Sequence, residues 1–479
     1  MTPQDLSDPT AWAQSVFGSA KLGDERRTKR LVLVAAQLAG HLGCSPAAAC
    51  GSSSATLEGA NRLIRNPGFD AKDILDAGLL MSAESAKKRS AGDENSTLSE
   101  YLAIQDSTVL SYCHSVRDEL GETGGPPKST ARGWIVHSTL LWSTGKTSVI
   151  ELIDQQWTIR TELGNRQERN KRPYEEKESY KWEAAHKRMT QRLGTELMKQ
   201  VIMVGDREAD IYQLMAYYQN PIARYVVRAS WDRAVRGPQP EDEYLWGTME
   251  KAPRLGSRQV ELPQRGGRKA RSAQLGLRAQ RVELRRPRKK APGTPEYLEV
   301  NVVYAKEENV PAGEEPLEWM ILTSEEIGSE EAVNRIMEKY ETRWQIEEFH
   351  KAWKSGTKVE ELRQQSADNL QKVAVVLGFI AVRLLKLKHY MEKEPEKKCT
   401  DVLKEEEWKI LWGSTEKTAL PQQAPTIQWA YKAIARLAGW TNTKRTGRAS
   451  WDTLWKGWQR MGDRLEGWLM GQRALRGEM

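Results

Sequence analysis

The sequence Tyr340-Glu-Thr-Arg-Trp-Gln-Ile-Glu-Glu-Phe-His-Lys-Ala-Trp-Lys354 predicts a helix, because it contains neither glycine nor proline. At about 3.6 residues per turn, Tyr340, Arg343, Glu347 and Lys354 fall on one narrow arc, which is apolar further upstream. Charged side chains on a buried face lower stability unless they are paired or bind a ligand. The arc is therefore either a solvated face with intrahelical ion pairs or an active-site helix. In the second case Glu347 is a metal ligand and the cations are placed to bind phosphate.

Length and composition limit the classes of protein that this chain can belong to. Its 479 residues suffice for two or three domains with their own cores. A net charge of +8 suits a polyanionic partner. The eighteen tryptophans, against four phenylalanines, can serve either core packing or base stacking. The four cysteines lack close metal-binding spacing, which indicates reduced thiols in the cytosol. We find no signal peptide, and the apolar run 373–382 is too short to span a bilayer, so we expect a soluble cytoplasmic protein without a membrane partner.

Residues 1–72 predict a small helical domain. Helices are expected at residues 10–17, 24–42 and 54–66, and Asp24 is a plausible N-cap of the second. Basic residues gather near the helix ends, namely Arg26, Arg27, Arg30 and Arg62. Such a unit is typical of a DNA-reading module. The alternative is a helical cap whose arginines are merely solvated.

Residues 73–388 predict an α/β domain, a mixed sheet with helices on its faces. The strand patterns lie at 101–106, 134–142, 147–153, 201–206 and 224–228, the second and third forming a hairpin. Helical patterns lie at 175–198 and 208–218, and the apolar segment 373–388 is expected to be a buried helix.

Residues 231–318 interrupt this order with what we expect to be a basic antiparallel β insertion. From residue 254 to residue 290, thirteen Lys or Arg stand against two Glu. Contact with a phosphate backbone is the simplest explanation of a charge excess this dense. A disordered basic loop is the alternative, and the recurring strand-like pieces argue against it.

Residues 389–479 predict a helical C-terminal domain, after a surface or linker region at 391–426. Its aromatic and aliphatic residues largely follow a three-to-four spacing, which makes one broad apolar face. The face includes Trp451, Trp455, Trp458 and Leu465. It either packs within its own domain or forms a helix-mediated dimer interface.

Asp106, Asp206 and Glu347 form the candidate catalytic group. We expect each aspartate at the carboxyl end of an apolar strand, the edge where ligands bind in open α/β sheets. If the two strands are neighbours, both carboxylates converge and Glu347 completes the site from a later helix. Three carboxylates without cysteine or histidine suit Mg²⁺ or Mn²⁺. Two such ions would activate a water or a 3′-hydroxyl and stabilise the leaving oxygen in phosphodiester displacement.

The same residues resemble a known family. Tyr340-x₂-Arg343-x₃-Glu347-x₆-Lys354 is similar to the YREK signature of the insertion-sequence-four family of bacterial DDE transposases. Further blocks resemble the family from about residue 10 to residue 470: Leu22–Leu31, Ala103–Thr108, Arg132–His137, Asp206–Asp210 and Lys444–Trp451.

The resemblance implies an RNase H-like catalytic core with a β insertion, and metal ligands at Asp106, Asp206 and Glu347. It implies that Tyr340, Arg343 and Lys354 hold phosphate, assisted by Arg228, Trp344 and Lys351. It places Trp319 as the aromatic on which a flipped base stacks while a DNA hairpin forms. Unstacking a base costs a few kcal/mol, and stacking on an aromatic side chain returns about 1–3 kcal/mol. Without the resemblance, a strand residue in a core is the favoured explanation of Trp319.

By the same resemblance, the protein is a bacterial, nucleoid-associated cut-and-paste transposase. It would bind the inverted repeats at transposon ends, nick and hairpin them, and join the 3′ ends to target DNA. Two copies would pair through the C-terminal face in one synaptic complex. A metal-dependent nuclease without strand transfer and a non-catalytic end-binding regulator remain alternatives.

Overall fold

The computed structural model describes residues 3–478, apart from 52, 93–99, 124–129, 144–149, 161–171, 221–222, 238–242, 263–269, 288–290, 292 and 444–448. Residues 144–146 of the predicted hairpin turn and much of the block Lys444–Trp451 therefore lie outside the described residues. Across the rest of the chain, mixed strands and helices confirm the predicted α/β class.

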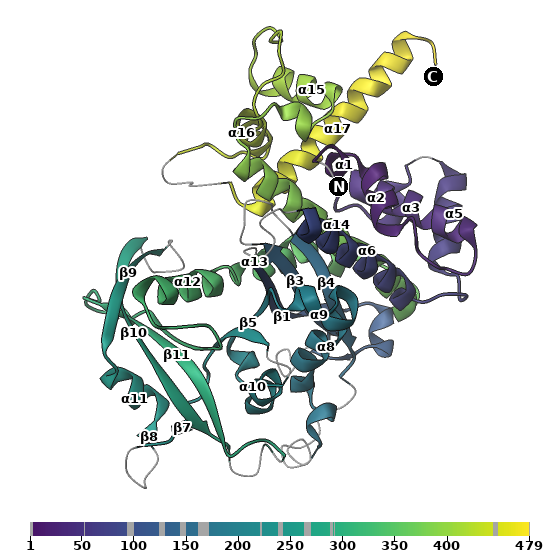
Figure 1. The fold of residues 1–479 in the computed structure, drawn as a ribbon. Coiled ribbons are helices and arrows are strands. Elements are labelled where there is room, and N and C mark those ends of the chain that lie inside the picture. Colours follow the sequence, from purple (N-terminus) through teal and green to yellow (C-terminus); the bar gives the residue numbers. More distant parts are fainter. Residues whose placement is uncertain are drawn as a thin grey trace.

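Twelve strands form one sheet in the described part of the chain (Figure 1). In its central part β1 (Tyr101–Tyr112), β3 (Arg132–Ser143) and β4 (Ile150–Thr158) are antiparallel neighbours, as the predicted hairpin requires. The strands β5 (Val201–Gly205) and β6 (Arg224–Arg228) run parallel to β1 on its other side. The short β2 (Gly121–Glu122) pairs with β3 at the edge. The order β4–β3–β1–β5–β6 brings the ends of β1 and β5 together.

The expected β insertion extends this same sheet instead of forming a separate one. β12 (Glu318–Thr323) pairs with β6, followed by β11 (Tyr297–Glu308) and β10 (Arg271–Arg285). β9 (Arg254–Leu262), β7 (Ala234–Val235) and β8 (Glu243–Tyr244) complete it, with α11 (Leu245–Lys251) packed against β10. All pairs within the extension are antiparallel, as predicted. The backbones of the described strands are hydrogen-bonded to one another. The alternative of a disordered basic loop is therefore excluded for these strands.

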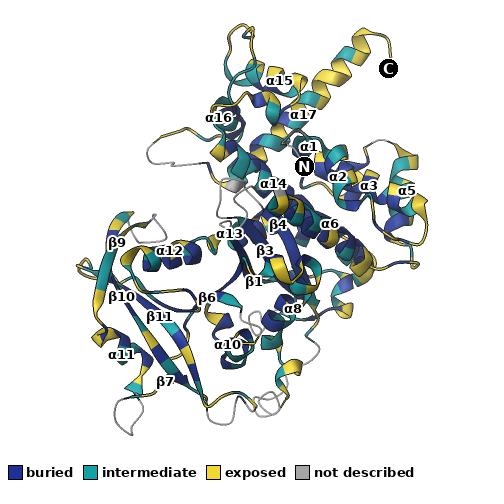
Figure 2. Cartoon of the chain, in the orientation of Figure 1, coloured by how far each residue is buried: buried dark blue, intermediate teal, exposed yellow. Residues whose placement is uncertain are grey.

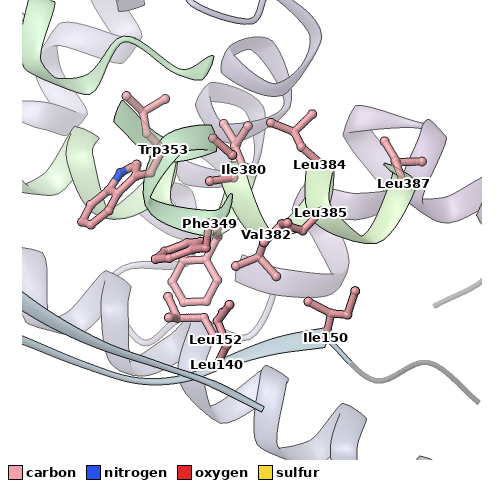
Figure 3. Packing of buried hydrophobic residues seen from close by; sticks show 14 of the residues in the cluster. Leu140, Ile150, Leu152, Phe349, Trp353, Ile380, Val382, Leu384, Leu385 and Leu387 are labelled. Atoms are coloured by element: carbon pink, nitrogen blue, oxygen red, sulfur yellow. The ribbon is translucent and has the colours of Figure 1, made fainter. Parts of the chain in front are cut away.

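Side-chain alternation along β1 separates two apolar cores, one on each face of the sheet. Leu102 and Ile104 lie in the core that is covered by α13 (Trp344–Lys351), α14 (Ala367–Lys393) and α6 (Ala71–Gly92). In this core Phe349 and Trp353 pack over Leu140 and Leu152 (Figure 3). Tyr101 and Ala103 lie in the other core, under α8 (Lys181–Leu193), α9 (Thr195–Met198) and α10 (Tyr212–Tyr218).

Five helices make up the N-terminal region: α1 (Pro3–Ser7), α2 (Pro9–Phe17), α3 (Glu25–Gly40), α4 (Pro46–Ala49) and α5 (Ser54–Ile64). Asp24 caps α3, as predicted, by accepting the Arg26 backbone N–H at 2.8 Å. The predicted buried helix is α14, and its buried Arg383 donates to the carbonyl oxygens of Leu6, Ser7 and Ala39. These bonds join the N-terminal helices to the body of the molecule.

The C-terminal region contains α15 (Glu405–Thr415), α16 (Ile427–Leu437) and α17 (Trp451–Leu475). The prediction of a surface linker at 391–426 is wrong, because this segment carries α15 and buries Cys399, Trp408 and Leu411. The apolar side chains of this segment were too sparse in the sequence to outweigh its lysines, glutamates and prolines. No helix in the described ranges is long and apolar enough to cross a membrane.

Candidate active site and nucleic-acid interface

The register of the central sheet aligns the two aspartates. Tyr101 to Ile104 of β1 lie opposite Val201 to Val204 of β5, so the same register continued places Asp106 opposite Asp206. Asp206 directly follows β5, as predicted. Asp106 does not end its strand, and that prediction is wrong: β1 continues to Tyr112, because β3 remains paired with it along its whole length. The two carboxylates nevertheless converge, as the sequence predicted.

Burial and mutual repulsion act on this aspartate pair. Burial, together with the charge of Asp206, raises the pKa of Asp106 to about 7, against the lowering effects of the Ser107 N–H and Arg343. Burial also raises the pKa of Asp206, although its carboxylate accepts the Glu208 backbone N–H at 2.8 Å. Both carboxylates are therefore held in a setting that opposes their negative charge.

Arg343 connects the aspartates to Glu347. One guanidinium nitrogen lies 3.9 Å from the Asp106 Oδ2 atom, and another donates to the Glu347 Oε1 atom at 2.6 Å. The second contact is an intrahelical ion pair, as expected if the arc of Tyr340, Arg343, Glu347 and Lys354 were a solvated helix face. The first contact shows that Arg343, a member of this arc, also faces the buried Asp106. The intrahelical ion pair is therefore present, and the interpretation as an active-site helix stays a prediction.

The predicted single helix over residues 340–354 is wrong. The helix α12 (Glu330–Glu341) ends at Glu341 and α13 begins at Trp344, with a tightened turn in which the Arg343 N–H bonds to the Tyr340 carbonyl at 3.0 Å. After α13 the chain widens into a π-turn, Ala352–Gly356. The irregular turns give the side chains directions that a regular 3.6-residue period does not predict.

Lys354 lies within this π-helical segment. Its ammonium group donates to the Val109 carbonyl oxygen at 2.8 Å and lies 3.4 Å from the Glu360 carboxylate. Glu360 also accepts the Ser111 backbone N–H at 2.8 Å. Lys354 therefore lies beside β1, three residues past Asp106. Sequence reasoning missed Glu360, because nothing in its Val359-Glu-Glu361 surroundings distinguishes it from a surface glutamate.

Aromatic and basic side chains lie beside the carboxylates. The Trp319 and Tyr340 rings meet edge to face with centroids 5.8 Å apart, and the Arg343 guanidinium carbon lies 6.0 Å from the Tyr340 ring. Arg228 donates at 2.9 Å to the carbonyl oxygen of Glu318, the residue that precedes Trp319. Trp344 is 48% exposed and Lys351 is also exposed. Trp319 is thus half-buried against Tyr340, whereas Trp344 and Lys351 are open to solvent, and their roles at the site stay predictions.

The donor set suits a hard cation in part. Asp106 and Asp206 offer carboxylate oxygens, and a divalent ion would relieve the repulsion that raises the pKa of Asp106. Within the described residues, no three aspartate, glutamate, histidine or cysteine side chains are gathered closely enough to hold one metal ion. Glu347 is bonded to Arg343, whose positive charge lies where it offsets two of the carboxylates. For Glu347 to serve as a third ligand, the guanidinium must move away.

The four N-terminal arginines are not equivalent. The Arg26 side chain is 92% exposed, and Arg62 is exposed beside Glu58. Arg27 instead donates to the Leu22 carbonyl oxygen at 2.9 Å and to the Gly68 carbonyl oxygen at 3.4 Å.

Arg30 also packs within the module, because a side chain at Gly59 of α5 would collide with its guanidinium. Two of the four arginines therefore face solvent, and two hold the module together.

The charge excess of the insertion is partly neutralised by carboxylates that lie further along the chain. Arg258 pairs with Glu338 at 3.4 Å and with Glu341 at 2.8 Å, both on α12. Arg254 lies 3.0 Å from Glu308. Arg271 and Arg281 pair with Glu307 and Glu299, respectively. Residues 263–269 and 288–290 of the basic run lie outside the described residues. The sequence count of thirteen cations thus overstates the charge that the described strands present to a partner.

The predicted apolar face of α17 is divided between two environments. Trp455 is only 5% exposed and packs in the core of its own chain, which corrects its assignment to a dimer interface. Trp458 and Leu465 are half-buried, and the side chain of Trp451 lies outside the described residues. The far end of α17 is exposed (Figure 2), with Trp468 at 42%. The alternative of packing within the domain is therefore correct for the first turns.

The α17 helix also contacts the N-terminal helices. The His41 Nε2 atom lies 2.9 Å from the Glu466 Oε1 atom, and Gln459 donates to the Leu42 carbonyl oxygen. Residues far apart in the sequence thus lie side by side at this contact.

One comparison with known proteins bears on the N-terminal region. Residues 9–68 match a family model described as transposase DNA-binding. The match runs from the first residue of α2 to the turn after α5 and includes all four N-terminal arginines. It supports a transposase that binds DNA through this module.

Proposed function

We propose that the protein is a cut-and-paste DNA transposase of the insertion-sequence-four family, with motifs closest to those of the transposon-five transposase. The observation that carries the proposal is the convergence of Asp106, Asp206 and the Arg343–Glu347 pair at one edge of the sheet. The N-terminal match to a transposase DNA-binding family supports it independently. The protein binds transposon ends, cleaves them with a hairpin intermediate, and joins the 3′ ends to target DNA.

In this proposal the central sheet is an RNase H-like core. The order β4–β3–β1–β5–β6 supports it, with three antiparallel strands followed by two strands parallel to β1. The domains are residues 1–72 for end binding, 73–388 for catalysis and 389–479 for dimerisation.

Asp106 and Asp206 would hold Mg²⁺ or Mn²⁺, with Glu347 joining them once DNA phosphate draws Arg343 away. Two bound ions would supply an activated water or 3′-hydroxyl and would stabilise the leaving oxygen. The oxygen atoms that would hold the ions belong to Asp106 on β1, to Asp206 directly after β5 and to Glu347 on α13.

Basic and aromatic residues around the carboxylates would position the DNA strand. Arg343 and Lys354, with the Tyr340 hydroxyl, would bind phosphate oxygens, and Arg343 can do so with two parallel N–H bonds. Arg228, Lys351 and Trp344 would assist at the rim. Trp319, at the start of β12, would stack on the base that leaves the helix while the hairpin forms.

The substrate would be cut within a homodimer in a synaptic complex. The exposed end of α17, which includes Trp468, and the half-buried Trp458 and Leu465 are the surfaces available for pairing two copies. In such a complex each end would be bound by one subunit's N-terminal module.

Cleavage of the element's own flanking inverted repeats with Mg²⁺ tests the proposal. Denaturing gels should show a nick, a hairpin and, with precut ends, joined products. Glu347→Ala should abolish all three, while Glu361→Ala, an exposed glutamate on a neighbouring turn, should leave them intact. Cleavage without hairpins or joined products would instead identify a metal-dependent nuclease. Binding without any cleavage would identify an end-binding regulator.

A further inference from the structure

Two highly exposed aromatic side chains line one hollow at the base of the insertion. Trp231 is 62% exposed and Tyr244 is 59% exposed, and they come from the loop after β6 and from β8. The hollow has a volume of about 630 Å³. A single exposed ring is unremarkable, but two rings from separate elements around one hollow indicate a surface that a ligand covers.

The hollow lies at the same edge of the sheet as the candidate active site. β5 and β6 are parallel, so Asp206 and the loop that carries Trp231 leave the sheet at their shared carboxyl end. One wall of the hollow begins at Asp210, four residues after Asp206. A DNA strand passing the carboxylates could therefore reach it.

Hydrogen bonds to Asp210 and Asp232 hold the walls of the hollow in place. Asp210 is 3% exposed and accepts the backbone N–H groups of Ser230 at 2.7 Å and Trp231 at 3.0 Å. Its other oxygen accepts two bonds from the Arg233 guanidinium, at 3.0 and 2.6 Å. Asp232 accepts the Trp246 backbone N–H at 2.9 Å, next to Tyr244. The loop that presents Trp231 is thus fixed to the segment that carries Asp206.

The charged groups of the hollow favour an anionic ligand. Arg285 and Arg286 lie on the wall formed by the end of β10, and one Arg286 nitrogen donates to the Thr294 carbonyl oxygen at 2.6 Å. The carboxylates on the lining are Asp210, neutralised by Arg233, and Asp232. Rings for base stacking and guanidinium groups for phosphate are together the chemistry of a nucleotide site.

We propose that this hollow binds an unpaired nucleotide of a DNA strand, with Trp231 and Tyr244 facing the base and Arg286 facing the phosphate. A paired base inside a duplex cannot present its face to either ring, so the site selects single-stranded or frayed DNA. The inference rests on the proposed function in that the protein handles DNA. A free nucleotide has the same chemistry, and the experiment separates the two sources.

The test uses the full-length protein and a short duplex with a single-stranded tail that carries 2-aminopurine. Stacking on Trp231 should quench the tail fluorescence, and a blunt duplex of the same sequence measures binding without a tail. Trp231→Ala and Tyr244→Ala should each weaken tailed binding about 5-fold or more, relative to blunt binding. Trp231→Phe should keep most of the preference, and Leu80→Ala, at an exposed leucine of α6 that does not line the hollow, should keep all of it. Thermal unfolding of each variant confirms that it is folded.

Equal preference for tailed DNA in the wild-type protein and in both alanine variants would overturn the proposal. Quenching that depends on Trp231 with 2-aminopurine mononucleotide, without any preference for the tailed duplex, would overturn it in favour of a free-nucleotide site. Cleavage of the inverted repeats is measured on the same preparations. Trp231-dependent tail binding without any cleavage would sink the transposase proposal and leave this one standing.

Discussion

At Asp106, burial and a neighbouring like charge both oppose the ionised carboxylate. Its carboxylate lies between Asp206 and Arg343 on a strand that is hydrogen-bonded on both sides. The folded pKa of about 7 exceeds the ordinary value of 3.8, so the folded state favours the protonated form. This residue therefore reduces stability progressively as the pH rises from about 4 to about 7.

Asp106→Asn should raise the free energy of unfolding at pH 8 without metal by about 1–4 kcal/mol. The amide removes the buried charge and the repulsion while keeping the shape of the side chain. Urea unfolding at pH 8 and at pH 4 checks this, since the gain should nearly vanish at pH 4. The same variant should not cleave DNA. A variant that is less stable than the wild type at pH 8 would contradict the burial argument.

Trp319→Ala should slow hairpin formation about 5-fold to 150-fold and leave the first nick intact. The half-buried ring meets Tyr340 edge to face, and its loss removes the surface on which the flipped base would stack. Single-turnover gels resolve the nick from the hairpin. Trp319→Phe should restore much of the rate, which mere structural damage would not allow.

At the scale of single elements, α14 organises the molecule. It is the buried helix that the apolar run predicted, and it packs on the sheet through the core that contains Leu140 and Leu152 (Figure 3). Two of its cations bond to the N-terminal region. Arg383 donates to the carbonyl oxygens of Leu6 and Ser7 in α1 and of Ala39 in α3, and Lys372 donates to the Asn66 carbonyl oxygen at 2.8 Å. Cations at helix carboxyl ends also meet the negative end of the helix dipole.

Arg383→Met should destabilise the N-terminal helices by about 2–4 kcal/mol, because three buried carbonyl oxygens lose their donor. Hydrogen exchange should show faster opening of α1 and α3 than of β1. Arg473→Ala, on the exposed end of α17, serves as the control and should change neither. Uniform destabilisation of the sheet and the N-terminal helices would mean that Arg383 does not act locally.

His186 on α8 should make stability fall as the pH decreases. Burial lowers its pKa to about 4, below the ordinary 6.5, and its Nδ1 atom lies 3.0 Å from the Tyr217 hydroxyl. A depressed folded pKa means that the stabilisation is complete above pH 6.5 and is lost toward pH 4. Between pH 7.5 and pH 5 its contribution should fall by about 2 kcal/mol. Urea unfolding of His186→Gln should show a shallower decline than the wild type, and parallel curves would refute this assignment.

On the scale of the whole molecule, the net charge of +8 has an uneven distribution. Several insertion arginines are paired with carboxylates, and Arg27 and Arg30 are used inside the N-terminal module. Arg26 and Arg62 remain on the surface of the region that matches the transposase DNA-binding family.

DNA binding should weaken steeply with salt, about a thousandfold between 50 and 200 mM if six or more phosphates are contacted. Arg26→Ala and Arg62→Ala should each reduce the slope of log affinity against log salt by about 0.9. Arg27→Ala should instead lower the melting temperature, because its guanidinium holds two backbone carbonyls. Fluorescence anisotropy over a salt series measures the slopes. A flat salt dependence would contradict the proposed phosphate contacts.

The sequence alone determined the elements whose patterns are strong and local. Alternating or continuous apolar runs gave the central strands and α14, Asp24 gave the start of α3, and the quoted blocks pointed to a transposase before any contact was known. The pairing of Asp106 with Asp206 could be anticipated because each follows an apolar strand segment of the same length.

Only the tertiary structure decided which charged side chains form ion pairs and which distant segments of the chain contact each other. The pairing partner β3, not the composition of β1, carries β1 past Asp106. Tight turns, not helical period, direct Arg343 toward Asp106 and place Lys354 beside Val109. The burial of Trp455, the internal use of Arg27 and the hollow under Trp231 all depend on residues distant in the sequence. Local patterns carry no information on such contacts, because burial and ion pairing are properties of neighbours in space.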